Sequence, residues 1–346
     1  MTAFPPSVRR TVTHSGTRIY TLEVDAYRSL PVNVFVILRG PVSQPTYRAL
    51  VDTGSERPAC FQQILGGLDH LHSTYGEQVG LEALDRIILT HEHPDHIGGL
   101  PLLQRHTRAP LAAHPLAAES LRDPLDAQQR SLSVQQEVYR WVGLPEEMSA
   151  AWLATQKRPV IPAGVTVATE LSLQELLDGF IQVIHVPGHA AGQVALGIDE
   201  VLLTADHLLP GSLPPLWPER LRPFLGLNHY LRSLRAVEQR PGIRQVLPSH
   251  GLPIDRPDQR VEAVRQKVIG KLERVIEQVG TAPGRTIFEI AQVLYPDQPA
   301  PRARLLLSQT AALVEYLAER NVLTEARGKQ GAATWTLGEQ TAELGV

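Results

Sequence analysis

The stretch that decides the fold is His91–Gly99, which reads HEHPDHIGG. It follows the short apolar run IILT, which is typical of a buried strand that ends abruptly in polar residues. Three imidazoles and one carboxylate within six residues favour binding of Zn(II), Fe or Mn at neutral pH. On a turn after a strand, alternate side chains can point to different sides. His91 and His93 can therefore share one metal ion while Asp95 and His96 face another.

Three later segments each place a metal-binding residue type at the end of an expected strand. They are HVPGHAAG with His189, LLTADH with Asp206 and VLPSHG with His250. Strand ends that gather at one rim are where an α/β scaffold usually builds its site. The four segments together predict a metal site assembled from distant parts of the chain.

The rest of the pattern alternates strands with helices. A helix is expected from Asp95 to Gln104, with Asp95 as its N-cap, and another over residues 228–238. Strands are expected at residues 17–24, 32–39, 47–55, 85–93, 108–113, 181–186, 194–198, 201–204 and 244–247.

These motifs carry a resemblance to a known family. HEHPDHIGG resembles the HxHxDH motif of the metallo-β-lactamase superfamily, and PGHAAG, TADH and PSHG resemble its later ligand segments in the same order. The resemblance covers roughly residues 17–258 and implies an α/β fold, a four-layer αββα sandwich with a dinuclear metal site at the sheet edges. It also implies seven ligands: His91, His93 and His189 for the first metal ion, Asp95, His96 and His250 for the second, and Asp206 between them.

Asp52, in the segment VDTGS, matches a further position of the family. There the carboxylate usually braces the histidine loop rather than binding metal, because a ligating imidazole needs its other N–H held. An ordinary turn residue is the alternative interpretation of Asp52.

The implied chemistry is hydrolysis. A bound metal ion lowers the pKa of water from 15.7 to about 7, and a hydroxide between two ions about 3.5–4 Å apart is a nucleophile at neutral pH. Asp95 would be the catalytic residue that orients this hydroxide and takes its proton, while the second ion would stabilise the developing oxyanion. Two zinc ions are the expected cofactors, with iron or manganese as alternatives.

Two stretches are placed to border a substrate pocket. Residues 115–160 predict two or three helices that form a lid, and a proline-rich loop follows Asp206 at residues 208–226. The alternative is that both merely cover core surface. Their aromatic and apolar content suits an acyl or aromatic substrate better than a sugar phosphate. The candidate pocket residues are His207, Trp217, Phe224, Asn228 and Tyr230.

The C-terminal stretch predicts a second, smaller domain. Residues 1–258 would form the catalytic domain, and residues 259–346 read as three amphipathic helices and a hairpin around a Gly-Lys-Gln-Gly turn, the outline of a winged helix. Winged helices suggest nucleic acid, but residues 260–346 hold eleven Lys and Arg against ten Asp and Glu, and phosphate binding needs a clear basic face. A structural role, or one in forming a homodimer, is therefore favoured.

Composition excludes several classes of protein. With 43% hydrophobic and 20% charged residues in 346, the chain is not disordered. A net charge of −3 argues against a chain that mainly coats nucleic acid or anionic membrane. No apolar run approaches the roughly 18 residues of a membrane span. The first residues lack a secretory pattern, and the single Cys60 excludes a disulfide framework, so a cytoplasmic setting is expected.

The favoured function is a dinuclear metal-dependent hydrolase of a small ester, thioester or lactone. One alternative is an endoribonuclease or phosphodiesterase acting on single-stranded nucleic acid, which predicts salt-sensitive binding. Another is a mononuclear iron sulfur oxygenase, which shares the HxHxDH motif but would use only the first three ligands. A non-enzymatic winged-helix regulator would leave an intact set of seven ligands unexplained. A β-lactamase is disfavoured because no secretion signal is evident.

Overall fold

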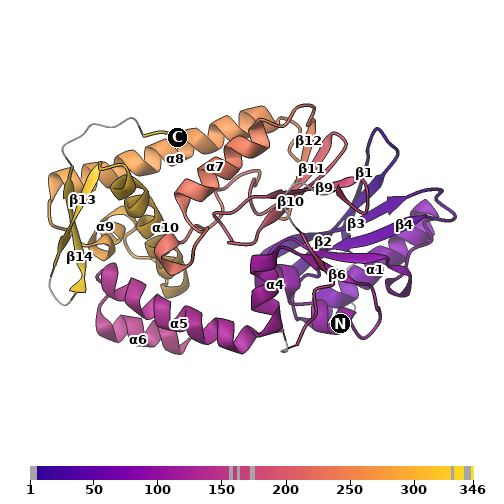
Figure 1. Ribbon diagram of the computed structural model, residues 1–346, viewed down its shortest axis with the longest axis horizontal. Coiled ribbons are helices and arrows are strands. Elements are labelled where there is room, and N and C mark those ends of the chain that lie inside the picture. Colours follow the sequence, from indigo (N-terminus) through magenta and orange to yellow (C-terminus); the bar gives the residue numbers. More distant parts are fainter. Residues whose placement is uncertain (1–5, 156–158, 162–163, 172–175, 329–330, 339–343) are drawn as a thin grey trace.

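Two β-sheets face each other in the right half of the computed structural model as Figure 1 shows it. The structure describes residues 6–155, 159–161, 164–171, 176–328, 331–338 and 344–346. The first sheet holds its strands in chain order: β1 (Ser7–Val12), β2 (Arg18–Tyr27), β3 (Leu30–Arg39), β4 (Tyr47–Val51), β5 (Arg86–Leu89), β6 (Leu111–Ala113) and β7 (Thr169–Glu170). The second sheet has the order β12 (Gln245–Pro248), β11 (Val201–Ala205), β10 (Val194–Ile198), β9 (Ile181–His185) and β8 (Leu176–Leu177).

Strand β3 shows why the strand sequences are apolar almost throughout. Alternate side chains of a strand point to opposite faces of its sheet. Phe35 and Ile37 enter the core between the two sheets, whereas Val34 and Val36 enter the core beneath helix α1 (Pro58–Tyr75). Because both faces of the sheet are covered, the strand does not alternate apolar residues with solvent-facing polar ones.

Helices cover the outer face of each sheet and complete four layers. The first sheet is covered by α1, the 3-10 turn η1 (Leu81–Ala83), α2 (Pro94–Ile97) and α3 (Leu100–Leu103). The second is covered by α7 (Leu227–Glu238) and the first turns of α8 (Pro257–Thr281). The expected αββα sandwich is confirmed. Helix α1 itself was not among the expected elements.

The chain after the histidine motif differs from the expected single helix. Two short helices, α2 and α3, are separated by Gly98 and Gly99, so the expectation of one helix from Asp95 to Gln104 is wrong. A Cβ atom on Gly99 would lie 2.0 Å from the carbonyl oxygen of Thr53, so only glycine allows this close approach. His93, not Asp95, occupies the N-cap position, which leaves the Asp95 side chain in the first turn.

The expected lid stretch forms three helices: α4 (Pro115–Arg122), α5 (Pro124–Trp141) and α6 (Glu146–Ala154). Residues 156–158 of that stretch lie outside the described residues. Figure 1 shows α5 and α6 running from the sheets towards the C-terminal helices. None of the described helices combines the length and the apolarity that crossing a membrane requires.

The C-terminal part consists of three helices and a hairpin: α8, α9 (Ile287–Leu294), α10 (Ala300–Glu319), β13 (Leu323–Arg327) and β14 (Ala333–Leu337). Residues 329 and 330 of the expected turn lie outside the described residues. One apolar core continues from Leu202 of the second sheet through Leu234 and Val264 to Leu317 of α10. This core crosses residue 258 without a break. The division of the chain into two domains at that residue therefore stays a prediction.

Candidate metal centre

The backbone brings the four motif segments to one edge of the two sheets. Strands β4 and β5 are parallel, as are β11 and β12, so their carboxyl ends meet at the same rim. Asp52 follows β4 and the histidine motif follows β5, while Asp206 and His250 follow β11 and β12. Asp52 is in the left-handed region with φ +62°, and Ala205 with φ +49°, which turns each chain sharply at the strand end.

Three imidazole nitrogens converge in the first cluster. His93 Nδ1 lies 3.1 Å from His91 Nε2 and 2.9 Å from His189 Nε2. The other ring nitrogens have partners: His91 Nδ1 lies 3.1 Å from the hydroxyl of Thr90, and His189 Nδ1 donates to the carbonyl of Pro215 at 2.7 Å. Both rings therefore carry their proton on Nδ1 and present the Nε2 lone pair to His93.

A cation satisfies this first cluster better than a proton does. A proton on His93 Nδ1 could serve only one of its two neighbours, whereas one metal ion accepts all three lone pairs. Nitrogens bound to one zinc ion at about 2.0–2.1 Å stand roughly 3.3 Å apart in tetrahedral geometry, which is close to the spacing here.

A second cluster lies beside the first and holds Asp95, His96 and His250. Asp95 Oδ2 stands 3.7 Å from His96 Nε2 and 3.4 Å from His250 Nε2. His250 Nδ1 donates to the carbonyl of Pro31 at 2.6 Å, so its Nε2 again faces the other potential ligands.

Asp206 joins the two clusters with one carboxylate oxygen to each. Its Oδ2 lies 3.3 Å from His189 Nε2, and its Oδ1 lies 3.5 Å from His96 Nε2 and 3.4 Å from His250 Nε2. His96 Nε2 and Asp206 Oδ1 are buried without a hydrogen-bond partner among the described residues. Buried polar atoms are normally satisfied, and a missing ion is one recognised reason when they are not. The donor set thus fits a pair of metal ions.

Asp52 contacts the loop in the way that a brace requires. Its carboxylate is fully buried and accepts three hydrogen bonds of 2.8 Å, from the backbone N–H and the hydroxyl of Thr90 and from His96 Nδ1. The Thr90 hydroxyl in turn accepts from His91 Nδ1. One carboxylate therefore orients a ring of each cluster, so that both Nε2 atoms point towards the other potential ligands.

The two clusters differ in electrostatic character. Burial, reinforced by neighbouring imidazoles, lowers the pKa of His93 to about 3, so this ring is neutral. Burial acts in the same direction on His96, but the carboxylates of Asp206, Asp52 and Asp95 outweigh it and raise the pKa of His96 to about 9. Burial also lowers the pKa of His91, so the first cluster holds at least two neutral imidazoles, whereas the carboxylates of the second cluster attract a positive charge.

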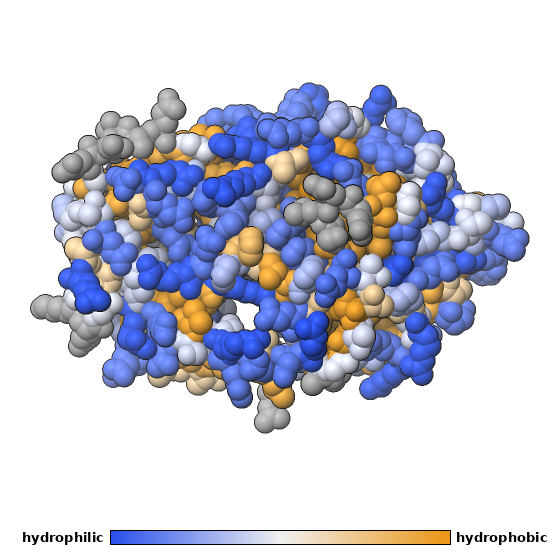
Figure 2. Space-filling view, in the orientation of Figure 1, coloured by the Kyte–Doolittle hydropathy of each residue, from blue (hydrophilic) through white to orange (hydrophobic). Residues whose placement is uncertain are grey.

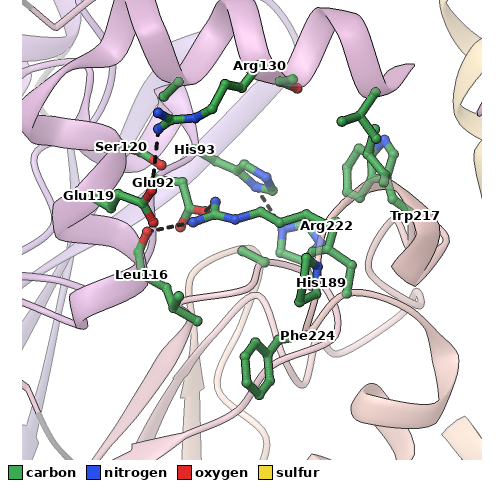
Figure 3. Close-up of a pocket in the computed structure, with 17 residues that line it drawn as sticks. Glu92, His93, Leu116, Glu119, Ser120, Arg130, His189, Trp217, Arg222 and Phe224 are labelled. Atoms are coloured by element: carbon green, nitrogen blue, oxygen red, sulfur yellow. Dashed lines mark hydrogen bonds and ion pairs between the residues drawn. The ribbon is translucent and has the colours of Figure 1, made fainter. Parts of the chain in front are cut away.

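A cavity of about 640 Å³ opens beside His93 and His189 (Figure 3). One wall comes from α4 and α5, with Leu116, Glu119, Ser120, Ala127, Arg130, Ser131 and Val134. The opposite wall comes from the loop before α7, with Trp217, Leu221, Arg222, Pro223, Phe224 and Leu225. In the space-filling view the surface is hollowed between α5 and the rest of the molecule, with apolar residues on the rim (Figure 2).

The charged side chains of this cavity are paired with one another. Arg222 donates to Glu92 Oε1 at 2.7 Å and to the carbonyl of Leu116 at 2.7 Å (Figure 3). Arg130 pairs with Glu119 at 3.3 Å and with Asp126. The walls therefore present apolar surface and internally balanced charge to a ligand.

The structure separates the candidate pocket residues into two groups. Trp217 and Phe224 line the cavity, and the Trp217 ring lies 5.7 Å from that of His93. His207, Asn228 and Tyr230 lie outside its lining. Tyr230 and His207 are fully buried with their rings 4.9 Å apart, and Asn228 accepts from the guanidinium of Arg320, the residue that follows α10, at 3.3 Å.

Sequence reasoning missed Glu92, Arg130 and Arg222. Glu92 stands between two predicted ligands, but its partner Arg222 is 130 residues away and no local pattern connects them. A charged residue inside a motif of ligands is the one available signal, because it needs a counterion when the motif is buried.

Comparisons with known proteins agree with this geometry. A family model described as the metallo-beta-lactamase superfamily matches residues 27–250. A probable metallo-hydrolase of Bacillus subtilis (strain 168), YqjP, is 25% identical over 265 residues, which are 71% of this chain and 78% of the relative.

Two solved structures share the fold. A metallo-beta-lactamase family protein from Thermus thermophilus has a TM-score of 0.69 at 23% identity, covering 92% of this chain and 98% of that one. A beta-lactamase domain protein from Burkholderia ambifaria has a TM-score of 0.73 at 19% identity, covering 95% of each chain. At these identities the likeness concerns the fold alone, whereas the family model spans all four motif segments. The chain belongs to the metallo-beta-lactamase superfamily and is a metal-dependent hydrolase.

Proposed function

We propose that the protein uses two divalent metal ions to hydrolyse a small ester, thioester or lactone with an apolar acyl part. The observation that carries this proposal is the pair of adjacent donor clusters, bridged by Asp206, beside an apolar-walled cavity. His91, His93 and His189 would hold one ion, and Asp95, His96 and His250 the other.

When bound, the two ions would supply a hydroxide nucleophile at neutral pH and polarise the scissile carbonyl. The chain's own residues would do the remaining work. Asp95 Oδ2 lies between His96 and His250 at the partly open side of the centre, where its carboxylate can orient water and accept a proton. Asp52 holds the tautomers of the ligands, and Trp217 shields the first cluster from solvent on the cavity side.

The cavity favours acyl substrates over nucleic acid. Its two arginines are already neutralised by Glu92 and Glu119, so no free cationic pair is offered to a phosphodiester among the described lining residues. Burial of each methylene group contributes about 0.8 kcal/mol to binding, which favours a substrate whose hydrocarbon chain lies against the apolar walls. The complete second cluster speaks for a dinuclear centre rather than the mononuclear iron site of a sulfur oxygenase. Zinc as the metal, a homodimer and a cytoplasmic setting stay predictions.

The test combines elemental analysis with a substrate panel. We expect about two zinc ions per chain, as the bridged donor clusters require, with turnover of a p-nitrophenyl ester, an acyl thioester or a lactone. His93→Ala should lose metal and abolish turnover while the chain stays folded. His14→Ala, which removes an exposed imidazole, is the matched control.

Other outcomes redirect the proposal. Turnover that survives His93→Ala would refute the metal-dependent mechanism. Cleavage of bis-p-nitrophenyl phosphate or single-stranded RNA without ester turnover would favour the nuclease. About one iron ion per chain without hydrolysis would favour the oxygenase.

A further inference from the structure

The C-terminal helix α10 contacts the loop that walls the cavity. The carboxylate of Glu315 accepts the backbone N–H of Glu219 at 2.6 Å and that of Arg220 at 3.0 Å. These two residues begin the 3-10 turn η2 (Glu219–Leu221), and the cavity-lining residues Leu221 to Leu225 follow directly after them. A side chain 95 positions further along the chain therefore holds the start of the wall.

The side chain of Glu219 contacts the wall itself. Its Oε1 accepts the backbone N–H of Phe224 at 3.3 Å and lies 2.8 Å from His229 Nε2. Glu315 fixes the main chain of Glu219, and the side chain of Glu219 fixes the backbone of Phe224. Three hydrogen bonds thus connect α10 to an aromatic residue that lines the cavity.

The far end of the wall is attached to the metal centre. The N–H of Gly226 donates to the carbonyl of Gly188 at 3.0 Å, and Gly188 precedes the ligand candidate His189. The wall from Leu221 to Leu225 is therefore held by Gly188 at one end and by Glu315 at the other, with Arg222 bound to Glu92 and to the carbonyl of Leu116 in between. Gly188 belongs to the four layers that hold the metal centre, whereas Glu315 belongs to the C-terminal part.

The same C-terminal part also contacts the opposite wall. The guanidinium of Arg220 lies over the ring of Trp141, the last residue of α5, at 4.6 Å. Trp141 Nε1 donates to Glu325 of β13 at 3.2 Å. Both walls of the cavity, the lid helix and the loop, therefore meet at residues of the C-terminal helices and hairpin.

We propose that Glu315 is a positioning residue for substrate selection, through which the C-terminal part sets the separation of the loop wall from helix α5. The proposal rests on the proposed function only where ester turnover is its readout. Without the carboxylate, two backbone N–H groups at the start of the loop lose a charged acceptor, and the loop keeps its attachments at Gly188 and through Arg222. The cavity then binds an extended acyl group less tightly, whereas the metal centre keeps its geometry.

The test uses Glu315→Ala and Glu315→Gln in the full-length chain, with Glu273→Gln as a control that makes the same charge change at an exposed position of α8. Hydrolysis of p-nitrophenyl octanoate is compared with that of p-nitrophenyl acetate, whose short acyl group offers less apolar surface to the walls. We expect Glu315→Ala to raise KM for octanoate about tenfold, in line with the loss of hydrogen bonds to a charged group. For acetate, kcat and KM of Glu315→Ala should stay within about twofold of the wild-type values. Glu315→Gln keeps one acceptor oxygen, so its KM for octanoate should lie between those of the wild type and Glu315→Ala.

Amide hydrogen exchange of residues 217–226 gives a readout that needs no activity. Exchange should accelerate there in Glu315→Ala and stay unchanged in Glu273→Gln. Unchanged exchange, or a parallel rise of KM for both esters, would overturn the positioning role. If the wild type hydrolyses neither ester, the proposed function is refuted. Amide hydrogen exchange of residues 217–226 still tests the positioning role of Glu315 in that case. If Glu315→Ala does not fold, the isosteric Glu315→Gln provides both readouts.

Discussion

Asp52→Asn offers a sharp test of how the second cluster is prepared for metal. The change keeps the volume of the side chain, and asparagine tolerates the left-handed backbone that Asp52 adopts. The asparagine oxygen can still accept the backbone N–H of Thr90. Its NH₂ group, however, would then face the N–H of His96 Nδ1, which now meets a carboxylate oxygen at 2.8 Å.

The expected magnitude follows from the proton that has to move. The Thr90 hydroxyl can rotate, because it is both a donor and an acceptor, but the ring N–H of His96 cannot. To recover a partner, His96 must carry its proton on Nε2, the atom that faces Asp95 and Asp206. Loss of such an orienting partner typically weakens metal binding 10–100-fold, about 1.4–2.8 kcal/mol. Rotating the asparagine amide by 180° does not remove the conflict, because its NH₂ group would then face the backbone N–H of Thr90.

The assay is competition with a chelator, followed by elemental analysis at limiting zinc. We expect one ion to bind with an affinity close to that of the wild type and the other 10–100-fold more weakly. Asp69→Asn, the same chemical change on the exposed side of α1, should leave both affinities unchanged. Two ions bound with wild-type affinity in folded Asp52→Asn would refute the argument that Asp52 controls the tautomer.

Two further predictions concern stability. Glu77→Gln should lower the free energy of unfolding by about 3 kcal/mol in urea titrations, because it removes the charge of a buried ion pair with Arg18 and places an NH₂ group opposite one N–H group of that guanidinium. A loss below about 1 kcal/mol would mean that the pair behaves as if exposed. In α1, Gly67→Ala should destabilise by about 1–3 kcal/mol, since its Cβ would lie 2.7 Å from Leu22 Cδ1. Gly66→Ala has no contact shorter than 3.8 Å and should stabilise by about 0.5–1 kcal/mol; equal effects of the two changes on thermal melting would contradict this packing.

The elements that could be predicted from the sequence are those whose signal is local. The strands β3, β5, β10 and β11 are short apolar runs bounded by turn residues, and the ligand types stand directly at strand ends. Helix α1 was missed because Gly66 and Gly67 interrupt its apolar periodicity. Those glycines make sense only beside β2, where Leu22 leaves no room for a Cβ at Gly67. A tertiary contact therefore overrides the weak helix propensity of glycine.

The expected helix from Asp95 shows a second limit. Aspartate is a common N-cap, so the pattern favoured a capping role. In the structure the carboxylate of Asp95 instead turns towards His96 and His250. Local helix chemistry and the metal centre compete for the same side chain. Propensity alone cannot decide between them, because His250 follows a strand of the other sheet.

The cavity is the part that sequence reasoning could reach least. Its two walls come from the lid helices and from a loop about a hundred residues later. They contact each other where Arg222 donates to the carbonyl of Leu116 and where Arg220 lies over Trp141. The candidate metal ligands, in contrast, lie in four short motifs. A family that shares its ligands can therefore vary its substrates by changing the walls alone, which is why a motif predicts chemistry better than it predicts substrate. In this chain the loop wall is also held by Glu315 of α10, so that changes in the C-terminal part can alter substrate choice without touching a ligand.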